Sequence, residues 1–121
     1  MTPPTFNAYY NPLLNEIVFP AGILQPPAFD IHAVDAVNYG SIGVVIGHEI
    51  SHGFDDQGAK FDAQGRLSNW WTPEDQKRFK EKTECVARQF DGYFIEPNIH
   101  HNGNLVLGES IGDLTGRKSL T

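Results

Sequence analysis

The chain has 121 residues, 15 acidic against 9 basic side chains, a formal net charge of −6 and 40% hydrophobic residues. Such a length and composition fit one ordinary soluble domain, or part of a larger one. Lys and Arg form no cluster, so the sequence provides no electrostatic footprint for nucleic acid or an anionic membrane, and we exclude both as partners. We also expect no membrane-spanning segment in this chain, because no run of about 18 apolar residues is present.

A small β element is predicted near the start of the chain. Residues 5–10 and 17–19 are rich in β-branched and aromatic side chains and are separated by Asn11-Pro12, which favours a pair of short strands. Prolines and glycines between Pro20 and Pro27 then predict an irregular connector up to about Ala33.

A long helix is predicted over residues 33–54, because the segment contains no proline and is longer than a usual strand. Its apolar side chains project from different sides, with Val37, Val44 and Val45 on one side and Tyr39, Ile42, Ile46 and Ile50 on the other. We therefore expect this helix to be buried on nearly all sides.

Two further helices follow a polar loop over residues 55–71. Thr72 is a suitable N-cap, Pro73 suits the first helical position, and acidic residues come directly after it. A loop is expected at residues 97–103 and a last helix at residues 105–118. The fold class is thus mainly α with a small β element (α+β).

A candidate for metal binding and catalysis is the segment His48-Glu49-Ile50-Ser51-His52. Residues four apart share one face of a helix, so both imidazoles can bind one ion while Glu49 projects to the side as a general base. The pattern is expected by chance in roughly one per cent of chains of this composition. It therefore indicates a zinc site of the metalloprotease type.

A catalytic zinc ion usually has three protein ligands, so a third must come from elsewhere in the chain. The best candidate is Glu109, which would share a helical face with Asp113. Asp113 and Asp55 are candidates for accepting the second N–H of a ligating imidazole. The zinc interpretation requires the Glu109 carboxylate to lie within about 6 Å of the point where the two rings converge.

Other metal-binding side chains are weaker candidates. His32 lies in a turn-rich stretch, where a solvated or packed histidine is the simpler interpretation. His100 and His101 are adjacent in a loop, and adjacent residues rarely bind one ion together. Cys85 has no partner ligands nearby in the sequence and, as the single cysteine, closes no internal disulfide, so we expect a packed helix residue.

Beyond the zinc motif, the chain resembles the catalytic part of the neprilysin and endothelin-converting-enzyme family of zinc endopeptidases. The matching stretches follow the family's order and span nearly the whole chain: residues 7–10, 19–27, 37–40, 47–58, 70–71 and 108–113. The resemblance implies a thermolysin-like zincin core with one zinc ion per chain. It implies that His48, His52 and Glu109 bind that ion, that Glu49 is the catalytic base, and that Asp113 supports a zinc-binding histidine.

The resemblance also implies the substrate, a small peptide held in extended form. Asn7, through its side-chain amide, and Ala8, through its main chain, are the expected contacts, since an exposed strand edge can pair with a peptide backbone. Asp55 is expected to accept a hydrogen bond from the second ring nitrogen of a ligating histidine.

Family members are much longer than this chain. They carry a second, mostly helical lobe, and they continue to a His and an Arg that stabilise the transition state. We therefore expect residues 1–121 to be a partial catalytic domain, without the rest of that domain and the covering lobe. Because family members generally work outside the cytoplasm, the resemblance implies an extracytoplasmic location.

Two other interpretations stay open. The chain could be a non-catalytic remnant that binds zinc for structure or presents a peptide-binding strand, because the downstream donors are absent from it. A metal-free helical interaction module is the third possibility. Metal content, peptide cleavage and the effect of a chelator on stability distinguish the three.

Overall fold

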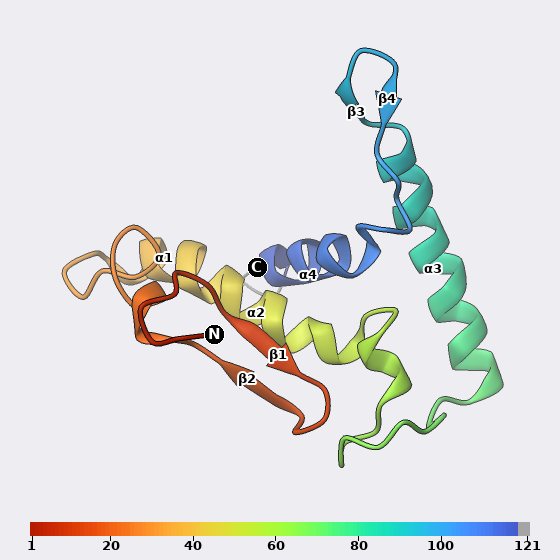
Figure 1. Cartoon of the computed structure of the whole chain (residues 1–121), viewed down its shortest axis with the longest axis horizontal. Helices are drawn as coiled ribbons and strands as arrows, with labels where there is room; N and C mark the ends of the chain where they lie inside the picture. Colours follow the sequence, from red (N-terminus) through yellow and green to blue (C-terminus); the bar gives the residue numbers. More distant parts are fainter. Residues whose placement is uncertain (119–121) are drawn as a thin grey trace.

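The computed structural model describes residues 1–118, so residues 119–121 of the predicted domain lie outside the described part. Helices dominate it, and two small two-stranded sheets accompany them (Figure 1). The expected class, mainly α with a small β element, is confirmed. None of the helices within residues 1–118 is both long and apolar enough to span a membrane.

The first sheet is the predicted hairpin near the N-terminus. β1 (Tyr9–Asn11) pairs antiparallel with β2 (Glu16–Val18), with Tyr9 opposite Val18. β1 begins later than the predicted residue 5 because the preceding backbone makes local bonds instead: Thr5 N–H donates to the Thr2 carbonyl at 3.0 Å. The strand prediction is right in kind, and its boundary is wrong by four residues.

A nearly continuous helical run, residues 35–54, occupies the place of the predicted long helix. It consists of α1 (Asp35–Asn38), a π-helical turn η2 (Tyr39–Gly43), α2 (Val44–Ser51) and a 3₁₀ turn η3 (His52–Phe54). Ser41 donates its hydroxyl hydrogen to the Val37 carbonyl at 2.8 Å within the wider turn. Such local widening of a helix is often found at functional sites.

Only parts of this run are covered by other described residues. α4 (Leu107–Lys118) lies alongside α2, and the β1–β2 hairpin lies on another side of it (Figure 1). The expectation of burial on nearly all sides is wrong, because several large apolar side chains of the run are exposed: Val37, Tyr39, Ile46 and Ile50. Apolar periodicity indicates which side chains favour burial, but neighbouring elements decide which are covered.

A compact core lies between the hairpin and the helical run. Ala8, Ile23 and Ile42 are buried together, and Phe19 and Val45 are among the half-buried side chains packed against them. Ile23 belongs to a 3₁₀ turn, η1 (Ala21–Ile23), within the predicted connector. This core joins the segment before β1 to the helix that carries the His-Glu-x-x-His motif.

α3 (Pro73–Asp91) begins as predicted. The Thr72 hydroxyl oxygen accepts a hydrogen bond from the Asp75 backbone N–H at 3.1 Å, which is the N-cap interaction. The expected packing of Cys85 is wrong, since its side chain is exposed on α3. None of the described elements covers that face of the helix.

A second hairpin follows α3 in place of part of the predicted loop. β3 (Phe94–Glu96) pairs antiparallel with β4 (Ile99–His100), and Asn98 has a positive φ of 70° in the turn between them. This hairpin lies at the far end of α3, away from α2 and α4 (Figure 1).

In the polar loop before α3, a short 3₁₀ turn η4 (Gly58–Lys60) is the one helical element.

Candidate metal centre

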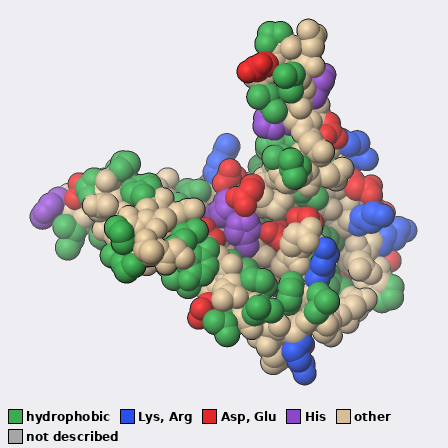
Figure 2. All heavy atoms as spheres, viewed as in Figure 1, with side chains coloured by type: hydrophobic (Ala, Val, Ile, Leu, Met, Phe, Trp, Pro, Cys, Tyr) green, Lys and Arg blue, Asp and Glu red, His purple; other side chains and the backbone are tan. Residues whose placement is uncertain are grey.

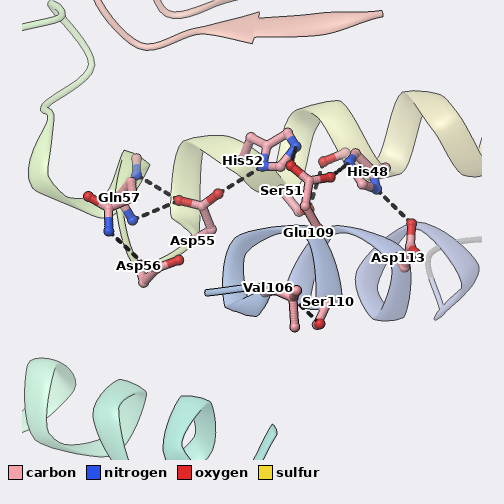
Figure 3. Close-up of polar contacts among 11 residues, drawn as sticks. His48, Ser51, His52, Asp55, Asp56, Gln57, Val106, Glu109, Ser110 and Asp113 are labelled. Atoms are coloured by element: carbon pink, nitrogen blue, oxygen red, sulfur yellow. Dashed lines mark hydrogen bonds and ion pairs between the residues drawn. The ribbon is translucent and has the colours of Figure 1, made fainter. Parts of the chain in front are cut away.

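The two histidines of the motif and Glu109 meet at the contact between α2 and α4. His48 Nε2 lies 3.3 Å from Glu109 Oε2, and His52 Nε2 lies 3.8 Å from Glu109 Oε1. One ligand atom from each of the three residues lies within 4.8 Å of the others. Figure 3 shows the Glu109 side chain reaching from α4 toward both imidazoles. The geometry thus meets the 6 Å requirement.

Each imidazole is held by a second carboxylate on its other nitrogen. His48 Nδ1 lies 2.8 Å from Asp113 Oδ1, and His52 Nδ1 lies 2.8 Å from Asp55 Oδ2 (Figure 3). Donation of the Nδ1 hydrogen to an aspartate leaves the Nε2 lone pair directed at Glu109. The two aspartates therefore orient the rings so that their Nε2 atoms face the same carboxylate.

Asp55 is itself fixed by the turn that follows η3. Its second oxygen, Oδ1, accepts hydrogen bonds from the backbone N–H groups of Gln57 at 2.8 Å and Gly58 at 2.7 Å. The Asp55 carboxylate is buried, whereas Asp113 is exposed on α4. Of the two supporting carboxylates, Asp55 is thus the more tightly held.

The donor set fits a tetrahedral zinc ion. With bonds of 2.0–2.2 Å, the ligand atoms of such a site lie roughly 3.3–3.6 Å apart. His48 Nε2 lies 3.3 Å from Glu109 Oε2, His52 Nε2 lies 3.8 Å from Glu109 Oε1, and the three ligand atoms lie within 4.8 Å of one another, so small side-chain rotations bring them to these spacings. Two imidazole nitrogens and one carboxylate oxygen also leave one coordination position open. Lone pairs of neutral rings facing a carboxylate repel it unless a cation or a proton lies between them.

Glu49 occupies a different environment beside these ligands. Only 5% of this residue's surface is exposed. Burial raises the pKa of the Glu49 carboxyl above its ordinary 4.5; His48 and His52 oppose the rise, and Glu109 adds to it. No hydrogen-bond donor to this carboxylate is found within residues 1–118. It is therefore a carboxylate whose proton affinity is raised and whose oxygens are not engaged by the described chain.

A cavity of about 690 Å³ brings the remaining predicted site residues together. His48, Glu49, His52 and Glu109 line it, as do Asn7 and Ala8. In the space-filling view, histidine and acidic side chains lie side by side near the middle of the visible face (Figure 2). All the predicted candidates except Asp113 therefore line one cavity, Asp55 included.

The segment expected to contact substrate is not part of β1. Asn7 and Ala8 lie just before the strand, and the Ala8 N–H donates to the Asn7 side-chain oxygen at 2.9 Å. The methyl side of Ala8 belongs to the core, where 4% of the residue's surface is exposed. Asn7 and Ala8 thus line the cavity from the segment before β1 and not from the strand itself.

The rival metal ligands lie elsewhere. His32 is exposed, and His100 donates from Nδ1 to the Asp91 carbonyl at 2.9 Å. The His101 ring contacts Phe90 edge to face, with ring centres 6.3 Å apart. Within residues 1–118, none of these three belongs to a group that could hold a metal ion.

Some residues of the cavity were not predicted. Tyr10, Gln57, Asn104 and Leu105 line it in addition to the residues already named. A signal for the Gln57 turn was available, because Asp followed by Gly three residues later favours a turn closed by the aspartate side chain. Asn104 and Leu105 precede α4 and carry no comparable local signal.

The chain is similar to known proteins over nearly its whole length. The model of Peptidase family M13 matches residues 7–119. The endothelin-converting enzyme homolog of Locusta migratoria is 51% identical over 119 residues, which cover 98% of this chain and 16% of that protein. Endothelin-converting enzyme 1 of Homo sapiens is 50% identical over 121 residues, which cover 98% of this chain and 15% of that protein. The chain therefore belongs to Peptidase family M13.

Solved structures are also similar to this chain over nearly its whole length. The crystal structure of PEPO from Lactobacillus rhamnosis HN001 has a TM-score of 0.94 and 45% identity, covering 99% of this chain and 19% of that one. The inhibitor complex of the Mycobacterium tuberculosis zinc metalloprotease ZMP1 has a TM-score of 0.92 and 55% identity, and the match covers 96% of this chain and 19% of that one. The chain thus spans about one fifth or less of the length of these relatives.

Proposed function

We propose that this chain carries the zinc ligands and the general base of a zinc-dependent endopeptidase that hydrolyses peptide bonds in small peptides. The observation that carries the proposal is the convergence of His48, His52 and Glu109 beside the buried carboxyl group of Glu49. Membership of Peptidase family M13 supports the same reaction class.

His48, His52 and Glu109 would hold one zinc ion per chain, as the spacing of their donor atoms suggests. Zinc in such a site supplies a Lewis acid that polarises a peptide carbonyl and acidifies water. Asp113 and Asp55 keep the His48 and His52 rings in the tautomer that presents Nε2. Asp113 thus acts on the reaction through His48.

Glu49 is the proposed general base. Its carboxylate accepts a proton from the attacking water and returns it to the nitrogen of the leaving amine. In the metal-free chain, burial raises the pKa of this carboxyl above its ordinary value, which favours uptake of a proton. The same cavity holds the peptide, with the Asn7 side-chain amide and the Ala8 main chain as contacts.

Glu49→Gln tests the role of the base. The amide keeps the shape of the side chain but accepts no proton, so we expect unchanged zinc content and a loss of peptide cleavage of about 10²- to 10⁴-fold. Metal analysis and cleavage of a quenched fluorescent peptide measure the two properties. Glu81→Gln, an exposed site on α3, is the matched control. Full activity in the Glu49 variant would remove this residue from the mechanism.

A non-catalytic remnant that binds zinc or a peptide is the second candidate. Among the described residues that line the cavity, there is no Lys, no Arg and no third His to stabilise negative charge on the substrate oxygen. Loss of one such donor typically lowers the rate by about 10²- to 10³-fold. Zinc binding without cleavage would support the remnant. A stability that does not respond to a chelator would support the metal-free interaction module.

We also propose an extracytoplasmic location, by resemblance to the neprilysin and endothelin-converting-enzyme family. Relatives named endothelin-converting enzyme are among the similar proteins, which supports the comparison. Fractionation of the source cells tests the proposal, and recovery of the protein with cytoplasmic markers alone would contradict it.

A further inference from the structure

Gly116 of α4 lies directly against the backbone of α2. A Cβ atom added to Gly116 would lie 2.4 Å from the Val44 carbonyl oxygen and 3.0 Å from the His48 backbone nitrogen. Both neighbours are main-chain atoms of α2, which cannot rotate out of the way as the end of a side chain can. Any side chain at this position therefore requires the two helices to move apart.

The size of that movement can be compared with what a metal site tolerates. A carbon atom and a carbonyl oxygen in ordinary contact lie about 3.3 Å or more apart, so the helices would have to separate by roughly 0.9 Å at this point. Bond lengths in zinc sites vary by only about 0.2 Å. The required displacement is thus several times the tolerance of the site.

The ligands and their supports are divided between these two helices. His48 and His52 come from the helical run over residues 35–54, whereas Glu109 and Asp113 come from α4. Asp113 lies one turn before Gly116 and contacts His48 Nδ1, and Glu109 lies about two turns before it. Moving α4 away at Gly116 would draw Asp113 from His48 first and Glu109 next.

We propose that Gly116 is a positioning residue for the metal-binding group, because its missing side chain sets the separation of α2 and α4 at which Glu109 and Asp113 reach the histidines. This inference rests on the proposed function, since it takes His48, His52 and Glu109 as the ligands. It adds a residue that touches neither the metal nor the substrate.

Gly116→Ala in the 121-residue chain tests the proposal, with Co²⁺ as a visible probe of the site. We expect binding at least about tenfold weaker than in the unchanged chain, together with an altered absorption spectrum of the bound ion, as is typical when a supporting group is lost. Gly40→Ala is the matched control, because a Cβ atom at Gly40 meets nothing within 4 Å. Its Co²⁺ affinity should stay within about twofold.

A double-mutant cycle separates positioning from a general loss of structure. In the Glu109→Ala background both remaining ligands belong to one helical run, so the position of α4 matters less. The effect of Gly116→Ala on Co²⁺ affinity should there be at least about threefold smaller than in the unchanged chain. An equal effect in both backgrounds would overturn the positioning role.

Failure of the proposed function and failure of the Gly116 proposal give different results. Absence of stoichiometric Co²⁺ or Zn²⁺ binding in the unchanged chain would refute the proposed function, and the inference with it. Normal binding by Gly116→Ala would overturn the inference alone. If circular dichroism shows Gly116→Ala unfolded without metal while Gly40→Ala is folded, Gly116 serves folding, and the positioning role is wrong.

Discussion

α3 and α4 follow each other along the chain but have very different surroundings. α3 has 19 residues and buries only Thr83 and Ala87, whereas α4 has 12 residues and buries Leu107, Ser110, Gly112 and Gly116. α3 is supported by local interactions, such as the Thr72 cap and the Arg78–Glu74 pair at 2.8 Å. α4 is placed by its contact with α2, where the candidate metal centre lies.

This difference separates two kinds of perturbation. Changes to the metal or to the carboxylates around it should act on α2 and α4, and changes to helix caps should act on α3. Local interactions of exposed helices are individually small, while contacts that bring distant segments together determine the geometry of a site.

Zinc should produce the largest effect, and it should be confined to the α2–α4 region. At a free concentration 100 times its dissociation constant, zinc should raise the free energy of unfolding by about 2.7 kcal/mol, because it binds only the folded chain. Amide hydrogen exchange should slow in α2 and α4 and stay unchanged in β3 and β4, where local opening dominates. Equal slowing in the β3–β4 hairpin would remove the distinction between the two regions.

The two supporting aspartates should separate metal affinity from stability. Asp113→Ala and Asp55→Ala should each weaken zinc binding by about 10- to 100-fold, or roughly 1.4–2.7 kcal/mol. Asp55→Ala should also lower the stability of the metal-free chain by about 1–3 kcal/mol, since the buried Gly58 loses the acceptor of its N–H. Asp113 is exposed, so its substitution should change that stability by less than about 0.5 kcal/mol.

Isothermal titration with zinc and urea unfolding of the metal-free variants measure the two quantities. A large loss of metal-free stability in Asp113→Ala would show that the contact between α4 and His48 holds the fold itself. α4 would then depend on this one contact for its place in the fold.

Thr72→Ala should have the smallest effect and act on α3 alone. Loss of the N-cap should lower the free energy of unfolding by about 1 kcal/mol, because the Asp75 N–H loses its acceptor. Zinc affinity should not change. Thr72→Ser keeps the hydroxyl and serves as the control, and urea unfolding measures all three proteins. A weaker zinc affinity in Thr72→Ala would mean that α3 contributes to the site.

Local patterns predicted the elements whose causes are local. The start of α3 follows from a threonine, a proline and two acidic residues in succession, and the structure has it at the expected residue. The β3–β4 hairpin was missed because Pro97 and Asn98 favoured a loop, although Asn98 between apolar residues is also a turn signal. Its two strands have only three and two residues, too few for a periodic pattern.

Burial could not be predicted in the same way. Ile50 has the apolar character of a core residue, yet half of its surface is exposed, because none of the described elements packs against that side of the helix. Cys85 is also exposed, although the sequence predicts a packed helix residue. Hydrophobic character is a property of the residue, whereas its coverage depends on segments elsewhere in the chain.

For the candidate site, the sequence by itself determined which chemistry is available and that His48 and His52 share a face, because one helical turn separates them. Only the tertiary structure decided that Glu109 reaches both rings, that Asp113 supports His48 while Asp55 supports His52, and that Gly116 lies against the backbone of α2. The helical repeat sets distances within one helix, but the packing of side chains and backbone sets those between two.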